Sequence, residues 1–130
     1  MPPVLTIVSP HFPPTRGGVA DHTLRLAENL APQTAVQVVT SQRNYSPAIC
    51  PVHANIKQWN DARELVSGIM ACAPEGPIVW QYVPHMYGRG GVNFALAGVL
   101  EQLRRAGRRQ LILAHEIAAP ISFWPQRFFY

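Results

Sequence analysis

The sequence predicts an α/β domain with a Rossmann-like, open and mostly parallel sheet flanked by helices. Short apolar runs rich in β-branched residues recur along the chain, which is typical of strands buried on both faces. Segments with helical spacing of apolar residues lie between these runs. Because strands and helices alternate, a parallel sheet is favoured. The 130 residues, 48% of them hydrophobic, suffice for the core of one domain.

The expected elements follow from this alternation and from Gly and Pro punctuation. Strands are predicted at residues 4–9, 35–40, 78–83 and 111–114, with a further short strand within residues 54–59. Helices are predicted at residues 19–31, 61–73 and 93–106, and residues 84–91 are expected to form a glycine-rich loop. Asp61 and Glu64 have capping-box spacing, and Gly107 suits the position after a helix.

Composition limits the classes of function. The net charge of +4 is mild, and no basic run interleaved with aromatics indicates nucleic-acid binding. Cys50 and Cys72 are too few for a disulfide framework, and the start of the chain has no basic signal-peptide region. We therefore expect a cytosolic protein. A basic cluster is either a solvated face or a contact for anionic headgroups at the inner face of a membrane: Arg104, Arg105, Arg108 and Arg109.

Three loops are expected at the carboxyl ends of strands, where open parallel sheets bind ligands. The first runs from His11 to Gly18, and its Gly17-Gly18 pair opens a helix. Backbone amides there, with Arg16, suit a phosphate, although a plain turn explains the glycines as well. The dinucleotide pattern G-x-G-x-x-G is absent, but Ser41 and Arg43 keep an NADP-binding domain as a distant alternative.

The other two loops carry aromatic and histidine side chains. Tyr82, His85 and Tyr87 could contact an acceptor, or residues 84–91 could be a simple surface loop. His115 and Glu116 end the last strand. His115 is either a structural histidine or a candidate to hydrogen-bond a substrate hydroxyl or to move a proton. A zinc-protease motif is excluded because position 119 is alanine. His22 lies off the apolar stripe of its helix and is expected to be exposed.

These motifs, taken in order, resemble the N-terminal domain of family-4 GT-B glycosyltransferases. The first loop and helix carry the sequence PTRGGVADHT, followed by LAENL at residues 26–30. The later part carries QYVP at residues 81–84, then Gly88, the helix around residues 96–103, and LILAHE at residues 111–116. The resemblance covers nearly the whole chain.

The resemblance implies a glycosyltransferase that moves a hexose from a sugar nucleotide to a glycan, lipid or small acceptor with retention. Arg16, Gly17 and Gly18 would then lie near a donor or acceptor phosphate, and His115 near the transferred sugar. Tyr82, His85 and Tyr87 would shape the acceptor pocket. The family usually needs no metal, and its only small-molecule requirement besides the acceptor is the sugar nucleotide as co-substrate.

The expected C-terminal, donor-binding domain of such an enzyme is missing from the sequence. We therefore expect residues 1–130 to be a truncated acceptor-side domain that is inactive alone and needs its second domain in cis or as a partner chain. The aromatic stretch at residues 121–130 fits a chain that stops within its fold, or a surface covered by a partner. A stand-alone glycan-binding or protein-interaction module is the main alternative.

Overall fold

The computed structural model describes residues 3–42 and 50–116, and these form a Rossmann-like α/β unit as the sequence predicts. Its five strands make one open, all-parallel sheet in the order β3-β2-β1-β4-β5. The strands are β1 (Leu5–Val8), β2 (Val36–Ser41), β3 (Val52–Ile56), β4 (Ile78–Tyr82) and β5 (Gln110–Ala114).

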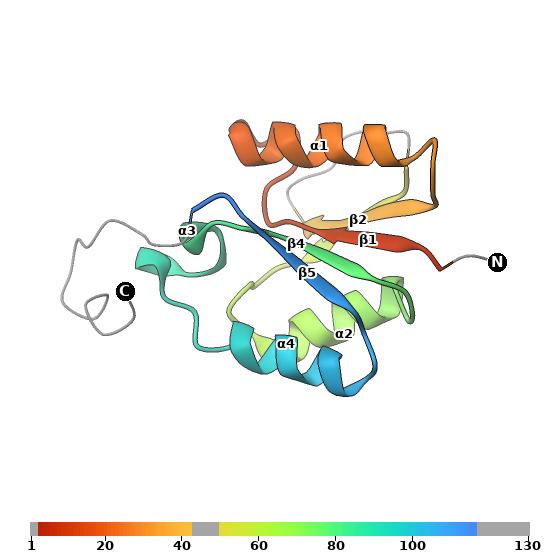
Figure 1. Cartoon of the computed structure of the whole chain (residues 1–130). Helices are drawn as coiled ribbons and strands as arrows, with labels where there is room; N and C mark the ends of the chain where they lie inside the picture. Colours follow the sequence, from red (N-terminus) through yellow and green to blue (C-terminus); the bar gives the residue numbers. More distant parts are fainter. Residues whose placement is uncertain (1–2, 43–49, 117–130) are drawn as a thin grey trace.

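Helices cover both faces of this sheet. Helix α1 (Gly18–Leu30) lies on one face, whereas α2 (Ala62–Cys72) and α4 (Leu96–Arg105) lie together on the other (Figure 1). Right-handed crossovers explain the two layers, because the strand order runs one way from β1 to β3 and the opposite way from β4 to β5. The topological switch point therefore falls between the neighbouring strands β1 and β4.

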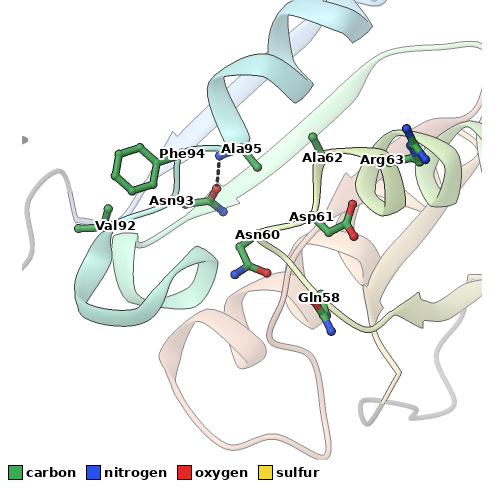
Figure 2. A pocket seen from close by; sticks show the side chains of 9 residues that line it. All are labelled: Gln58, Asn60, Asp61, Ala62, Arg63, Val92, Asn93, Phe94 and Ala95. Atoms are coloured by element: carbon green, nitrogen blue, oxygen red, sulfur yellow. Dashed lines mark hydrogen bonds between the residues drawn. The ribbon is translucent and has the colours of Figure 1, made fainter.

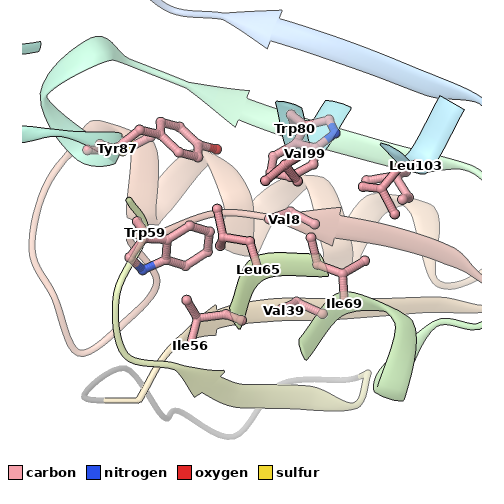
Figure 3. Close-up of a cluster of buried hydrophobic side chains, with 12 residues drawn as sticks. Val8, Val39, Ile56, Trp59, Leu65, Ile69, Trp80, Tyr87, Val99 and Leu103 are labelled. Atoms are coloured by element: carbon pink, nitrogen blue, oxygen red, sulfur yellow. The ribbon is translucent and has the colours of Figure 1, made fainter. Parts of the chain in front are cut away.

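The core is divided by the sheet into two unequal parts. Alternating strand residues supply both, so that Val8 packs toward α2 and α4 while Ile7 packs toward α1. The larger part includes the aromatic residues Trp59, Trp80 and Tyr87, and the Tyr87 ring contacts both tryptophans (Figure 3). Phe12 and Ala27 belong to the smaller part beneath α1. Ile78 and Trp80 of β4 belong to the larger part, and β4 leads into the candidate site.

The third strand begins earlier than predicted, at Val52 rather than Ala54, and ends at Ile56. Its polar residues His53 and Asn55 hid the strand in the sequence, because their partners come from distant segments. His53 is hydrogen-bonded to Gln37 of β2, and Asn55 donates to the Gly68 carbonyl and the Cys72 sulfur of α2.

The segment predicted as a loop at residues 84–91 contains a short helix, α3 (Pro84–Tyr87), and a 3-10 turn, η1 (Arg89–Gly91). Proline at the first helical position is preorganised for the turn. Gly88 is required for the tight return of the chain, because a Cβ there would lie 1.9 Å from the Val92 carbonyl oxygen. The expected loop is thus an ordered turn that packs Tyr87 into the core.

Local helix signals in the sequence are confirmed in part. The Asp61 side chain accepts a hydrogen bond from the Glu64 amide at 3.0 Å, as predicted. Glu64 does not complete the capping box, since its carboxylate accepts instead from the amides of Lys57 and Gln58. Gly107 follows α4 with φ of 81°, the left-handed conformation expected after a helix. The predicted aromatic stretch at 121–130 lies outside the described residues.

Candidate functional site

The carboxyl edge of the sheet brings together the ends of β1, β4 and β5. The loop after β1 turns into α1 on one face, and the segment after β4 turns into α3. His115 follows β5, and its amide donates to the Tyr82 carbonyl at 2.9 Å, which continues the pairing of β5 with β4. Chain segments therefore diverge at the switch point, the place where open α/β sheets bind ligands.

Two histidines from distant segments meet here on either side of one buried glutamine. The Gln81 side-chain oxygen lies 2.6 Å from Nε2 of His115, and its side-chain nitrogen lies 2.9 Å from Nδ1 of His22. The two imidazole rings contact each other edge to face, with centroids 4.8 Å apart. Gln81 is fully buried, whereas both histidines are exposed. We refer to these three residues as the histidine–glutamine cluster.

Strand alternation builds this cluster. Trp80 and Tyr82 pack against the α2 and α4 side of the sheet, so Gln81 between them faces α1. His22 lies in the second turn of α1 and reaches the same side. A buried amide must find hydrogen-bond partners, and the two rings provide them.

The surroundings of His115 favour its neutral form. Partial burial lowers the pKa of His115 below its ordinary value, and the nearby His22 lowers it further. A neutral imidazole has one N–H and one lone pair. Because Nε2 of His115 is engaged with Gln81, Nδ1 is the nitrogen left for another partner.

The start of α1 supplies the second element of the site. Gly17 has φ of 143° and ψ of 165°, a conformation essentially restricted to glycine. No side chain caps the helix, so its first amides are open to an anion, and Arg16, Gly17 and Gly18 are all exposed. The arrangement suits a phosphate at this helix end.

The three predicted acceptor contacts are placed very differently. Tyr82 is half-buried and His85 is exposed on α3. Tyr87 is only 2% exposed, stacks on Tyr82, and donates its hydroxyl proton to the Gln81 carbonyl. The expected role of Tyr87 in an acceptor pocket is therefore corrected to a core role, since burial leaves no ring face for a ligand.

A hollow of about 630 Å³ lies between the loop after β3 and the segment before α4. Figure 2 shows Gln58, Asn60 and Asp61 on one wall and Val92 to Ala95 on the other. Asn93 is fixed there, because its side-chain oxygen accepts from the Ala95 and Leu96 amides and its nitrogen donates to backbone carbonyls. Phe94 is 80% exposed at the rim. An exposed aromatic ring beside amide side chains suits a sugar face.

Other sequence candidates fall outside the carboxyl edge. Arg108 is buried and donates to the carbonyls of Gly76 and Ala73, so it is not part of a surface cluster as the sequence indicated. Arg104 and Arg105 are exposed and share Glu101, an arrangement that lowers the pKa of Glu101 to about 2. Burial, with the opposing effect of the Asn55 hydrogen bond, raises the pKa of the Cys72 thiol.

The NADP alternative loses one of its two contacts. The Ser41 hydroxyl is buried, donates to the Pro10 carbonyl at 2.7 Å and accepts from the Trp59 ring nitrogen at 2.8 Å. It therefore cannot meet a 2′-phosphate, and Arg43 lies outside the described residues. Within residues 3–42 and 50–116, no group of three or more potential metal ligands comes together.

Sequence reasoning missed Gln81 and the role of His22. Gln81 is the single strongly polar residue of the apolar run Ile78–Tyr82, a signal that a partner must lie opposite. His22 is exposed as expected, but its place off the apolar stripe of α1 also turns it toward the neighbouring strand end.

Comparison with protein-family models, curated proteins and solved structures gave no match for this chain. None of the helices in the described part of the chain has both the length and the apolar character needed to cross a bilayer.

Proposed function

We propose that this chain is the acceptor-side domain of a retaining GT-B glycosyltransferase of the family-4 kind. The observation that carries the proposal is the meeting of the histidine–glutamine cluster with the open start of α1 at one sheet edge. Motif order supports it independently, because the PTRGGVADHT and LILAHE segments that resemble the family supply both parts.

The start of α1 would receive a phosphate of the sugar-nucleotide donor or of a phosphorylated acceptor. Its amides and the positive end of the helix dipole stabilise negative charge, and Arg16 adds an exposed cation. For a donor diphosphate the benefit is greatest as the sugar bond breaks, because charge then develops on the leaving group.

His115 would contact the sugar that is transferred, together with His22. A sugar hydroxyl both donates and accepts hydrogen bonds, and a pair of neutral imidazoles offers both partners. The acceptor would lie along Tyr82, His85 and the hollow lined by planar amide side chains. This replaces Tyr87 in the acceptor pocket.

The active enzyme requires a second Rossmann-like domain, in cis or on a partner chain, to hold the nucleotide. Transfer depends on donor and acceptor being placed against each other, so residues 1–130 alone are expected to bind but not to turn over. The acceptor class remains a glycan, a lipid headgroup or a small hydroxyl compound.

Binding to the 130-residue chain tests the proposal most directly. Saturation-transfer NMR with uridine and guanosine diphosphate sugars and methyl glycosides should give signals for the sugar protons. The ³¹P resonances of the sugar nucleotides and of free nucleoside diphosphates should broaden on binding. Arg16→Gln should weaken diphosphate binding by about threefold to tenfold, the range for loss of one charged contact. Arg25→Gln is the matched control, since Arg25 is exposed on the same helix beyond its first turn.

Absence of any transfer signal from sugars and sugar nucleotides would contradict the proposal, as would binding of NADPH at the start of α1. With the second domain present, His115→Ala should lower transfer far more than His85→Ala. Equal activities of those two variants would also reject the proposed place of the sugar.

A further inference from the structure

The amide of Gln81 limits the number of protons that the histidine–glutamine cluster can carry. The side chain is completely buried, and its oxygen and nitrogen are each engaged by one histidine, at 2.6 Å and 2.9 Å. A carboxamide nitrogen only donates and a carboxamide oxygen only accepts. The two histidines therefore face opposite ends of one polar group.

In the present orientation, the Gln81 nitrogen donates to Nδ1 of His22, which must offer a lone pair. A histidine that offers a lone pair is neutral, so only His115 can become an imidazolium while both hydrogen bonds persist. If the amide turns over, the roles exchange: His115 must then offer the lone pair and only His22 can be charged. The limit of one charge thus holds for either orientation of the amide.

We propose that Gln81 is a positioning residue that limits the His22–His115 pair to one positive charge. When both rings are neutral, the nitrogen that faces away from Gln81 is a hydrogen-bond donor on one ring and an acceptor on the other. In the present orientation the outer donor is Nε2–H of His22 and the outer acceptor is Nδ1 of His115. This arrangement matches a hydroxyl. Uptake of one proton converts the pair to two donors with one charge, which matches a phosphoryl oxygen.

Electrostatics acts in the same direction as the hydrogen bonds. The rings are in contact, so two imidazolium charges would repel each other even at this exposed position. The other titratable or charged residues on the surrounding elements are Asp21, Arg25 and Glu28 of α1, His11 and Arg16 of the loop before it, Tyr82 of β4, His85 and Tyr87 of α3, and Glu116 after β5. Across residues 3–42 and 50–116, no ion pair joins a carboxylate to either histidine.

The proton count can be measured on the whole chain without any ligand. Long-range ¹H–¹⁵N correlation spectra of the imidazoles, recorded from pH 8.5 to pH 5, report the tautomer and charge of each ring. We expect one ring of the pair to become imidazolium and the other to remain neutral. If both rings become imidazolium at pH 5 while the backbone amide spectrum stays folded, the proposal is overturned.

The same spectra contain an internal control. Nε2 of His53 is 3.0 Å from the side-chain oxygen of Gln37, whose nitrogen donates elsewhere. The Nε2–H of His53 should therefore persist throughout the same series of spectra. It should be unaffected by substitutions at Gln81.

Two variants separate the amide from simple charge repulsion. Gln81→Glu places an acceptor toward both rings, so the pair should take up two protons instead of one. Gln81→Leu removes both hydrogen bonds, and the two rings should then choose tautomers independently. If Gln81→Leu keeps the wild-type tautomers and single charge, repulsion alone sets the limit and the role of Gln81 is rejected, even if Gln81→Glu fails to fold.

Only the match to a substrate hydroxyl rests on the proposed function, because the titration needs neither sugar nor nucleotide. A chain that shows the single proton but binds no sugar or sugar nucleotide retains this inference and loses the glycosyltransferase proposal. A chain that binds sugar nucleotides but charges both rings retains the proposal and loses the role of Gln81.

Discussion

Two buried glutamines occupy opposite ends of the sheet and differ in what surrounds them. The Gln37 side chain donates to the Thr6 hydroxyl at 3.0 Å and to the Cys72 carbonyl at 2.9 Å, and its oxygen is bonded to His53. The Gln81 side chain is held by two histidines at the open carboxyl edge. Both amides satisfy their hydrogen bonds, as burial requires.

The difference shows that a buried glutamine can either stabilise the fold or orient the side chains of a candidate site. Gln37 ties two strands to the end of α2, so its partners are largely fixed parts of the fold. The partners of Gln81 are exposed, titratable rings, and each uses only one nitrogen for Gln81, at Nδ1 of His22 and Nε2 of His115. We therefore expect changes at Gln37 to be read mainly in stability and changes at Gln81 mainly in the chemistry of the rings.

Gln37→Leu, at the amino end of the sheet, should have the largest effect on the free energy of unfolding. The substitution strands the Thr6 hydroxyl and the Cys72 carbonyl and deprives His53 of its acceptor. At about 1 to 3 kcal/mol for each buried group left unpaired, partly relieved by water, we expect a loss of about 3 kcal/mol. Urea unfolding measures it. A loss below about 1 kcal/mol would show that this network is not the structural tie inferred here.

The next largest effect on stability is expected at Gly17, where α1 begins at the carboxyl edge of the sheet. Gly17→Ala forces a residue with a Cβ into φ of 143°, at a cost of about 2 kcal/mol. Gly18→Ala is the matched control: Gly18 has no such φ and open space for a Cβ, so its stability should be close to that of the wild type. Equal stabilities of the two variants would mean that α1 begins without the strained glycine.

Local signals made most of the fold predictable. The apolar runs around Ile7 and Val79 and the Asp61 cap lie within a few residues of the elements they specify. The start of β3 was missed because His53 is polar and its partner is Gln37, 16 residues away. A hydrogen bond to a residue distant in the sequence cannot be recognised from the local pattern of polar and apolar residues.

The site was predictable only in outline, for the same reason. The sheet edge, the start of α1 and His115 follow from motif order and topology. The contact of Gln81 with His22 spans 59 residues and depends on which face of β4 turns toward α1. Tyr87 was misplaced because an aromatic residue in a glycine-rich segment resembles a surface contact until Gly88 and Asn93 fold that segment back.

Gln81→Leu should lower the free energy of unfolding less than Gln37→Leu does. Its two partners are exposed rings that water can hydrogen-bond, so the loss should be about 1 kcal/mol. The same denaturation experiment, run beside Gln37→Leu, gives the ratio directly. If the Gln81 variant is destabilised as much as the Gln37 variant, Gln81 is a structural tie of the same kind and the contrast between the two ends fails.

The smallest expected effect is the pH dependence of stability that His115 contributes. Its pKa is lower in the folded protein than in the unfolded chain, chiefly through burial and secondarily through His22. Below an unfolded pKa of about 6.5, the unfolded state binds more protons, so stability falls as pH drops through that value and levels off below the folded pKa. The fall is modest because His115 is exposed and solvent screens it. Unfolding free energies at pH 7.5 and pH 5.5 should therefore differ less in His115→Gln than in the wild type. If the difference in unfolding free energy between the two pH values is unchanged in His115→Gln, protonation of another group causes it. That result would count against a special role of the two histidine rings at the carboxyl edge of the sheet.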